Sequence, residues 1–487
     1  MREGANPMGN PMGNMGSRTI SALVRNRPGV LAGISAQFAL ADCNIDRLTV
    51  SADRDPALAW MKISAKADDR TLSTLLSRLE AMQEVLSVRA RDARKETMAY
   101  GTVAYCLFVV IFGINLASPI YSIYKETWDL TPAMVTALFA AYAFPVIPSI
   151  VLFGQMAHRL GPRRILGAGL AFAAIGSLGL AVADGYGWML AARTMQGVAV
   201  GMFNGVAVGA MTDLHATRDR RTAAFAAAAM VTAGNALGPV ASGSLAEFAP
   251  MPTVLPYALH LLMLAAAMAG LAFVEMRTER VPRSRLHLPF VPPGLRLPFA
   301  TASASSFIAW SAVSLFLSVV PSYLDEWVGR SGYLVSGCTA AFVLGLSVLG
   351  QRSMEKMPVP VAASFGCAFM AFGLVSLFLS NAASSSAWLV ASAACVGLGH
   401  GPLYAVGLGA VNRISPDAAR ADLISLYYAI TYVGVSLPVM GLGLAAQRLD
   451  WTEATGWWTA AMLVLLALVW RGWMREARFR PKEFTDR

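Results

Sequence analysis

Residues 154–164 read Gly-Gln-Met-Ala-His-Arg-Leu-Gly-Pro-Arg-Arg and separate two long apolar runs. A run of about 20 apolar residues is long enough to cross a bilayer as a helix. A short segment that holds glycine and three arginines between two such runs is typical of a loop at a membrane surface. The segment therefore indicates a membrane protein whose spans are joined by short, charged loops.

Similar apolar runs continue on both sides of this loop. Of the 487 residues, 56% are hydrophobic and 14% are charged, and the mean hydropathy is +0.53. Soluble domains average about 25% charged residues, so this composition indicates a chain surrounded by lipid. We expect twelve spanning helices between residues 99 and 475, arranged as an α-helical polytopic protein.

Positive charge alternates between the connections. Five alternate loops, together with the neighbouring helix ends, hold fifteen Lys and Arg residues, whereas the other loops hold only Lys125, Arg330 and Arg448. Cytoplasmic loops are the positive ones, so both termini are predicted to be cytoplasmic in a cell inner (plasma) membrane. The net charge of +10 is explained by this distribution, and we expect no nucleic-acid partner.

The two halves of the apolar region resemble each other. A shift of 200 residues places Gly197, Gly201 and Gly209 on other glycines, and a shift of 199 places Arg221 and Pro239 on Arg420 and Pro438. Two related halves of six helices are the design of many secondary transporters.

Three motifs resemble those of the major facilitator superfamily. In the loop, Gly154, Arg159, Gly161, Arg163 and Arg164 match the signature Gly-x-x-x-Asp-Arg-x-Gly-Arg-Arg, with His158 in place of the acid and Pro162 in place of the usual basic residue. In that family the acid belongs to a charge network that latches the cytoplasmic side, and a histidine there would make the latch weaker or pH-sensitive.

The second and third motifs lie inside expected spans. Arg193 and the residues to Gly197 resemble the fourth-helix motif, and a buried arginine in a membrane normally serves a pathway or a partner. Residues 234–243, with Gly238 and Pro239, resemble the fifth-helix signature of proton-linked antiporters. The resemblance implies proton-driven efflux of a small organic solute, and uptake is the alternative.

Polar and aromatic side chains on the expected inner helices are the candidates for contact with the small-molecule substrate. They are mostly neutral, which suits an amphipathic or sugar-like solute. His400 breaks the symmetry of the repeat, since its counterpart is Val200, and it is one candidate proton carrier beside Arg193 and His260. The cavity candidates are Asn115, Tyr124, Asn204, Asn235, Trp310, His400, Tyr404, Tyr428 and Tyr432.

The region before the spans has a different pattern. Alternating and helical apolar spacings in residues 18–92 predict the order βαββαβ. Residues 23–31, 44–50 and 55–56 resemble an ACT domain of the acetolactate synthase small subunit. The resemblance implies an amino-acid effector held at a dimer interface by Asn26, Gly29, Val30, Leu31 and Asn44.

No cofactor, metal site, nucleotide loop or hydrolase triad is expected, so we do not expect an enzyme. The alternative function is that of a membrane-tethered ACT module that regulates an amino-acid biosynthetic enzyme.

These patterns divide the whole chain into segments. The expected segments are a disordered tail (1–17), the ACT domain (18–92), a basic linker (93–98), one six-helix bundle (99–275), a cytoplasmic loop (276–298), a second six-helix bundle (299–475) and a cytoplasmic tail (476–487).

Overall fold

The computed structural model describes residues 16–52, 55–214, 220–276, 289–320, 332–416 and 419–479. Its contacts divide the chain into two units. The first unit comprises the residues up to Val103 together with Gly209–Phe225, and the second comprises Ala104–Val208 and Ala226–Arg487.

The first unit contains a four-stranded antiparallel sheet with the strand order β2-β3-β1-β4. The order of elements along the chain is βαββαβ, which confirms the prediction. We call this part of the unit the sheet domain. Its elements are β1 (Gly16–Arg25), α1 (Val30–Leu40), β2 (Ile45–Ala52), β3 (Leu58–Ala67), α2 (Asp69–Glu80) and β4 (Val85–Asp92).

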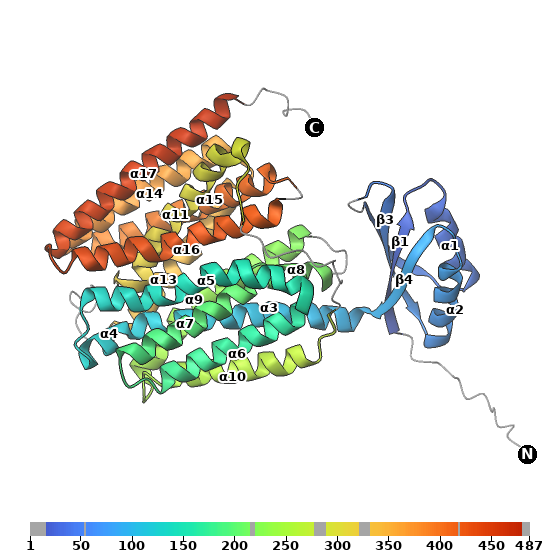
Figure 1. Ribbon diagram of the computed structural model, residues 1–487, viewed down its shortest axis with the longest axis horizontal. Coiled ribbons are helices and arrows are strands. Elements are labelled where there is room, and N and C mark those ends of the chain that lie inside the picture. The colour runs from blue at the N-terminus through green and yellow to red at the C-terminus, as the bar shows by residue number, and fades with distance from the viewer. Residues whose placement is uncertain are drawn as a thin grey trace, which may run out of the picture. The chain divides into compact units, whose positions relative to one another are not determined.

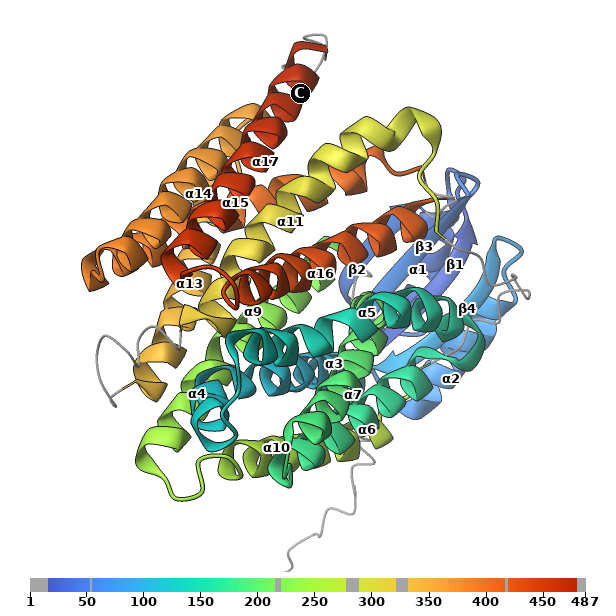
Figure 2. The ribbon, with the colours of Figure 1, turned by 60° about the vertical axis from the view of Figure 1, so that its left-hand side comes forward.

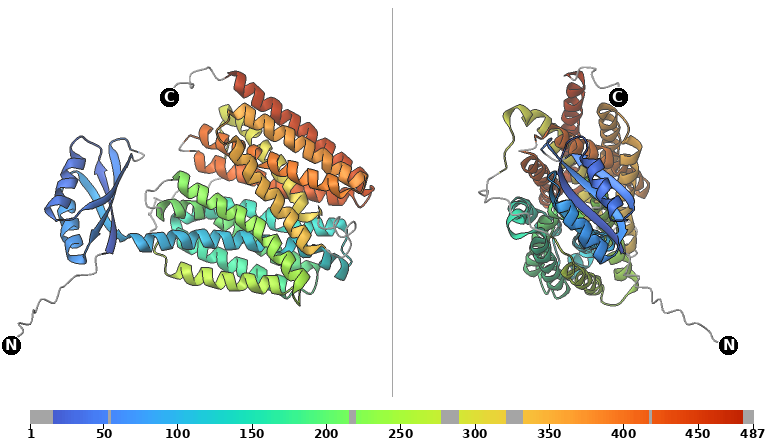
Figure 3. Two further views of the ribbon diagram at one scale, coloured as in Figure 1. Left: turned by 180° about the vertical axis from the view of Figure 1, so that it is seen from behind. Right: turned by 90° about the vertical axis from the view of Figure 1, so that its right-hand side faces the viewer.

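The two helices cover one face of this sheet, as Figure 1 and the left view of Figure 3 show. Alternate residues of a strand point to opposite faces, so Met61 and Ile63 of β3 join the core while Trp60 and Lys62 lie on the other face. Phe38 of α1 completes the core from the helical side. The uncovered face is therefore free to carry polar side chains.

Local signals in the sequence set the starts of both helices. Gly29 has a φ of 92° and directly precedes α1, a left-handed conformation that favours glycine. Asp68 precedes α2, and its carboxylate accepts a hydrogen bond of 2.7 Å from the Thr71 backbone N–H.

The second unit contains most of the membrane-length helices. In the described part of the chain, twelve helical segments are long and apolar enough to cross a membrane, as predicted. The first half consists of α3 (Ala93–Asn115), α4 (Ala117–Thr127), α5 (Pro132–Leu160), α6 (Pro162–Ala181), α7 (Tyr186–Phe203), α8 (Val206–Leu214), α9 (Arg220–Phe248) and α10 (Leu255–Ala272). The second half consists of η1 (Pro293–Leu295), α11 (Arg296–Ser318), α13 (Tyr333–Met354), α14 (Val359–Ala382), α15 (Ser386–Ile414), α16 (Arg420–Ala445) and α17 (Trp451–Phe479).

Two of the spans in the first half are interrupted. The first span runs through α3 and α4, which meet at Leu116. The fourth runs through α7 and α8, and Gly205 between them has a φ of 81°. Only glycine adopts this conformation without strain, so the break in the fourth span is set by that residue.

The strand β4 continues into the first span without an intervening loop. It ends at Asp92, and α3 begins at Ala93. Residues 93–98, predicted to be a basic linker, therefore form the first turns of α3.

Candidate functional site

The two halves of the second unit contact each other along α5 and α16 and also at one end of their helices. We name the end that holds residues 154–164 the loop end, and the other the opposite end. At the opposite end, the Leu334 backbone N–H donates a hydrogen bond of 2.9 Å to Glu247 Oε2, and the Ser118 hydroxyl donates to the Leu317 carbonyl. Gln447 and Thr131 form a further hydrogen bond of 3.3 Å there. The helix α5 also lies along α16, as Figure 2 shows.

The small residues of the fifth-helix motif lie where α9 crosses other helices. A Cβ atom on Gly238 would lie 2.5 Å from the Phe112 carbonyl oxygen of α3. A Cβ atom on Gly243 would collide with the Tyr333 carbonyl of α13, and one on Gly337 of α13 would collide with the Pro239 carbonyl. The motif therefore permits close backbone packing of α9 both within its own half and against the other half.

The predicted loop motif joins α5 to α6 in a tight turn. Gly161 has a φ of 87°, which explains the glycine at this position. Arg163 donates a hydrogen bond of 2.5 Å to the Ala272 carbonyl at the end of α10. Arg159 and Arg164 are exposed, and space is open around Gly154. The side chain of His158 lies outside the described part of the structure, so the latch remains a prediction.

Arg193 is buried, and two of its nitrogens donate hydrogen bonds to three acceptors. Its Nη1 donates to the Ile114 carbonyl at 2.7 Å and to Gln196 Oε1 at 2.9 Å, and its Nε donates to the Leu138 carbonyl at 3.3 Å. The guanidinium carbon lies 4.6 Å from the centre of the Tyr142 ring, a cation–π contact. These contacts hold one positive charge inside the first half.

A chain of hydrogen bonds continues from this arginine. The Gln196 amide donates to the Ser177 hydroxyl at 3.3 Å, and that hydroxyl lies 2.6 Å from His260 Nδ1. His260 Nε2 lies 3.0 Å from the Val109 carbonyl. A carbonyl only accepts, so Nε2 carries the hydrogen and Nδ1 of the neutral ring accepts from Ser177. Arg193 and His260 were predicted from the sequence, whereas Ser177 and Gln196, which connect them, were not.

Several of the predicted cavity residues form pairs. Asn115 Nδ2 donates to Asn235 Oδ1 at 2.8 Å and joins α3 to α9. Asn204 Nδ2 donates to the Tyr432 hydroxyl at 3.1 Å and joins the two halves. Tyr124 instead stacks on Trp128, with ring centres 5.1 Å apart, near the opposite end.

The remaining candidates form an aromatic cluster in the second half. The Trp310 ring of α11 lies edge-on to the rings of His400 and Tyr404 of α15, with centres 4.9 and 5.9 Å away. The Tyr404 ring lies 6.2 Å from that of Tyr427 of α16, and the Tyr427 ring lies 6.0 Å from that of Tyr428, between centres. Since Tyr432 of the same helix reaches Asn204, the cluster extends to the plane where the halves face each other.

The sheet domain has a hollow at the start of α1. Its volume is about 650 Å³, and its lining residues are Arg25, Arg27, Pro28, Gly29, Val30, Gly33, Met82, Gln83 and Glu84. Asn26 Nδ2 donates to the Pro56 carbonyl at 3.1 Å, and Leu31 is exposed. Asn44 follows α1 and so lies beyond its other end. One copy of the chain therefore brings together Gly29 and Val30 but not Asn44.

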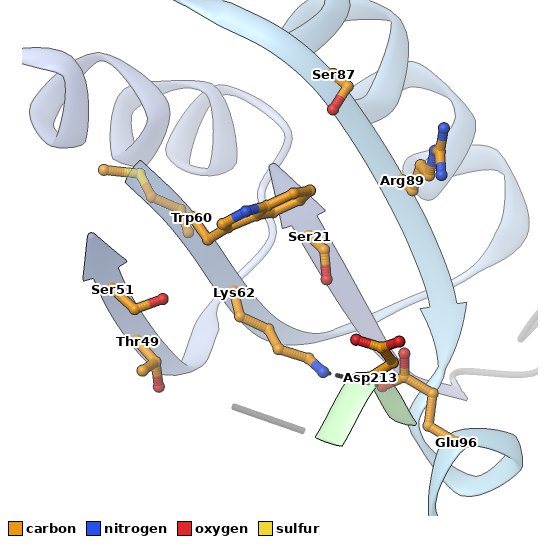
Figure 4. A pocket seen from close by; sticks show the side chains of 10 residues that line it. Ser21, Thr49, Ser51, Trp60, Lys62, Ser87, Arg89, Glu96 and Asp213 are labelled. Carbon is orange, nitrogen blue, oxygen red and sulfur yellow. Dashed lines mark hydrogen bonds and ion pairs between the residues drawn. The ribbon is translucent and has the colours of Figure 1, made fainter. Parts of the chain in front are cut away.

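A second, smaller hollow lies on the uncovered face of the sheet. Its volume is about 50 Å³, and we call it the sheet-face pocket. The Lys62 amine lies 3.2 Å from Glu96 Oε2 of α3, and Figure 4 shows these two side chains and that of Asp213 of α8 pointing toward one another. This charged group was not predicted from the sequence, because its members are far apart in the chain. The other lining residues are Ser21, Thr49, Ser51, Trp60, Met61, Ser87 and Arg89.

Comparison with protein families agrees with both parts of the structure. The model of the Major Facilitator Superfamily matches residues 103–437. The chain belongs to the major facilitator superfamily. Residues 20–87 match the acetolactate synthase (AHAS) small subunit-like ACT domain, so this superfamily member carries an N-terminal ACT domain.

Curated relatives match this superfamily member over one part at a time. A "Probable acetolactate synthase small subunit" of Methanothermobacter thermautotrophicus is 39% identical over 70 residues, which are 14% of this chain and 42% of the relative. The "Quinolone resistance protein NorA" of Staphylococcus aureus is 26% identical over 141 residues, which are 29% of this chain and 36% of the relative. The chain thus spans less than half the length of either relative.

Solved transporter structures share the superfamily fold. A bacterial homologue of the human lysosomal transporter Spinster, in an inward-facing conformation, has a TM-score of 0.59 at 14% identity. The alignment covers 79% of this chain and 97% of that one. A D-xylose-proton symporter gives 0.63 at 14% identity, with 76% and 97% covered. At these identities the likeness establishes the fold alone.

Proposed function

We propose that this protein exports a small organic solute in exchange for protons and that its ACT domain senses an amino acid in the cytosol. The observation that carries the proposal is the close crossing of α9 and α13 at Gly243 and Gly337. The antiporter-like motif lies on the seam between the halves, where an alternating-access transporter must open and close.

The conformation in the structure is consistent with one state of an alternating-access cycle. The halves are joined by hydrogen bonds at the opposite end, through Glu247 and Leu334 and through Gln447 and Thr131. With the loop end in the cytoplasm, as the fifteen-to-three distribution of positive residues predicts, this state is closed toward the outside. Breaking these contacts would give the outward-open state.

Export is favoured over uptake by two observations. The fifth-helix motif resembles that of antiporters, and a stretch of the chain is similar to a protein named for quinolone resistance. Proton coupling would use the buried chain from Arg193 to His260, because no Asp or Glu lies at the centre of a described span.

The ACT domain would bind an amino acid at the start of α1. Backbone N–H groups at a helix N-terminus suit a carboxylate, and the hollow there also contains Arg25 and Arg27. Asn44 would come from a second copy in a dimer, since it follows the other end of α1. Binding would alter transport only to the extent that the effector prefers one conformation of the transporter.

Contacts within the first unit offer a route for that coupling. The Lys62–Glu96 ion pair links β3 of the ACT domain to the first turn of α3, and Asp213 brings the end of α8 to the same pocket. A shift of the sheet would thereby reach the first and fourth spans directly.

Inverted membrane vesicles test the transport proposal. Respiration acidifies their interior, so a proton-exchanging exporter should accumulate norfloxacin, a quinolone, inside. We expect several-fold accumulation that nigericin abolishes, and its loss in Gly238→Ala, whose added methyl meets the Phe112 carbonyl. Gly345→Ala is the matched control, since nothing lies within 4 Å of the added atom. Accumulation that survives nigericin, or that occurs only in right-side-out vesicles, contradicts proton-driven export.

Thermal unfolding of the full-length protein in detergent tests the sensing proposal. One of the twenty amino acids should raise the melting temperature of the wild type, and hydrogen exchange should slow around Gly29 and Val30. The Gly29→Val variant should lose both effects, because a β-branched residue is strained at a φ of 92°. If no amino acid shifts the melting temperature, the sensing part of the proposal is wrong.

A second candidate function is regulation of a biosynthetic enzyme by a membrane-tethered ACT module. The 39% identity to an acetolactate synthase small subunit favours it. Pull-down of the detergent-solubilised protein with acetolactate synthase catalytic chains should then recover a complex. A variant without the ACT residues should recover none. Recovery of the transporter alone would argue against this function.

A further inference from the structure

Two N–H groups in the aromatic cluster lack a partner. His400 is buried, with 3% of its surface exposed, and its Nε2 forms no hydrogen bond in the described structure. The buried indole Nε1 of Trp310 also forms no hydrogen bond in the described structure. The centres of the Trp310 and His400 rings lie 4.9 Å apart. Neighbouring rings from α11 and α15 thus each present an unused nitrogen.

The partner of the other histidine nitrogen fixes which of these nitrogens donate. His400 Nδ1 lies 2.7 Å from the Ser347 hydroxyl. No other acceptor for that hydroxyl is found among the described residues, so Ser347 donates and Nδ1 accepts. The neutral imidazole then carries its hydrogen on Nε2. Both unused nitrogens are therefore donors, since an indole nitrogen only donates.

Two unused donors limit what can occupy the site. A buried donor without an acceptor costs about 1–3 kcal/mol. Water can satisfy such donors while the site is hydrated, but a ligand that displaces the water must replace its hydrogen bonds or bind less tightly. A cationic group cannot do so, because it offers no lone pair.

The rings around the two donors define the rest of the ligand. His400 and Tyr404 are nearly parallel, with 12° between their planes, and Trp310 is perpendicular to both at 87°. Tyr427 and Tyr428 extend the aromatic surface along α16. Such surfaces favour flat, apolar bodies.

We propose that Trp310 and His400 form a subsite for an acceptor oxygen, of the carboxylate or carbonyl type, on an aromatic substrate. The inference rests on the proposed function in that it places the substrate path at this cluster. It goes beyond that function because it assigns the substrate a hydrogen-bond-accepting group and names the two donors that recognise it.

Calorimetric titration of the full-length protein in detergent tests the subsite with probes that share one aromatic body. The probes are 2-naphthoate, 2-naphthamide and 2-naphthylmethylammonium. We expect 2-naphthoate to bind and the ammonium probe to bind at least tenfold more weakly. Binding of naphthamide as well shows that a neutral oxygen suffices, whereas binding of naphthoate alone requires the carboxylate, and both results support the subsite.

Conservative variants then identify the donors. Trp310→Phe keeps an aromatic ring and removes the N–H, so it should weaken naphthoate binding about tenfold, the loss expected for one buried hydrogen bond. Trp457→Phe is the control, since Trp457 is 73% exposed on the membrane unit and should bind as the wild type does. His400→Phe should weaken binding similarly and should leave the weak ammonium binding unchanged.

Three outcomes would overturn the inference. They are equal or tighter binding of the ammonium probe, absence of binding by every acceptor probe, and equal affinity of Trp310→Phe and Trp457→Phe for naphthoate. These titrations use no ion gradient. Loss of proton-driven accumulation with intact naphthoate binding would therefore refute the proposed function and leave the subsite standing.

Discussion

The Lys62 amine on β3 lies 3.2 Å from a Glu96 carboxylate oxygen on α3, and the two side chains are only 15% and 9% exposed. This ion pair connects the ACT sheet to the first span. Because the pair is largely shielded from solvent, its stability depends on both residues: removal of one leaves the other charge poorly solvated.

We predict that Lys62→Glu loosens the start of α3. The new carboxylate faces Glu96 and Asp213, and like charges repel. Trypsin should then cleave the full-length protein faster after Arg94 and Lys95. The double variant Lys62→Glu/Glu96→Lys should recover most of the protection. Lys66→Glu, exposed on the same strand and outside the pocket, is the control. Equal cleavage in the Lys62 and Lys66 variants would show that the pair has no such role.

The crossing of α9 and α13 gives a second prediction. Gly337→Ala introduces a methyl that collides with the Pro239 carbonyl, and it should disfavour the state closed at the opposite end. In a cysteine-free background, copper phenanthroline should cross-link Glu247→Cys to Leu334→Cys, whose native residues are hydrogen-bonded. The yield should fall at least twofold with Gly337→Ala. Gly345→Ala on the same helix should leave it unchanged, and a fall with both variants would count against a specific contact.

The position of His260 gives a third prediction. A Cβ atom on Gly113 would occupy the place of the His260 ring, so Gly113→Ala should displace the ring from Ser177 and Val109. We expect a loss of about 1–3 kcal/mol, the cost of leaving buried polar groups unpaired. The melting temperature in detergent should drop by several degrees, as in His260→Ala. Gly101→Ala on the same helix meets nothing within 4 Å and should melt like the wild type.

Cys43 in the ACT domain gives a prediction for pH. Burial raises the pKa of its thiol above the ordinary value of 9.0, and the charges of Asp46 and Asp42 raise it further. The thiolate is the reactive form, so iodoacetamide should modify Cys43 slowly at pH 9 in the folded protein and rapidly after denaturation. Ser73→Cys, exposed on α2, should react at the ordinary rate. Equal rates at the two sites would contradict the raised pKa.

The same shift predicts how stability depends on pH. Above pH 9 the unfolded chain releases the Cys43 proton while the folded chain retains it. The unfolded state then binds fewer protons, so this residue lowers the stability of the ACT domain as the pH rises. The stability of the ACT domain, measured by hydrogen exchange at pH 8 and at pH 10, should fall less between the two pH values in Cys43→Ala than in the wild type.

Much of the fold could be predicted because it depends on local periodicity. The βαββαβ order and the twelve spans follow from apolar spacing, and the structure confirms both. The interrupted spans were not predicted, although Gly205 carries a weak signal for the second break. The linker was assigned from its charge, but residues 93–98 continue α3 because nothing in them stops a helix.

The candidate site could be predicted only as single residues. Asn115 and Asn235 were named separately, and their hydrogen bond depends on the packing of helices 120 positions apart. The asymmetry of the repeat identified His400, but its partner Ser347 is an ordinary helical serine with no signal of its own. Lys62, Glu96 and Asp213 were missed because charge near a membrane surface normally indicates only solvation.

The direct passage from β4 to α3 between Asp92 and Ala93 constrains anyone who would graft another sensor onto this transporter. Each residue inserted there would rotate the emerging helix by about 100° and advance it about 1.5 Å. Chimeras should therefore tolerate insertions of about seven residues, two full turns, better than insertions of two or five. At this junction the number of residues therefore matters as much as their identity.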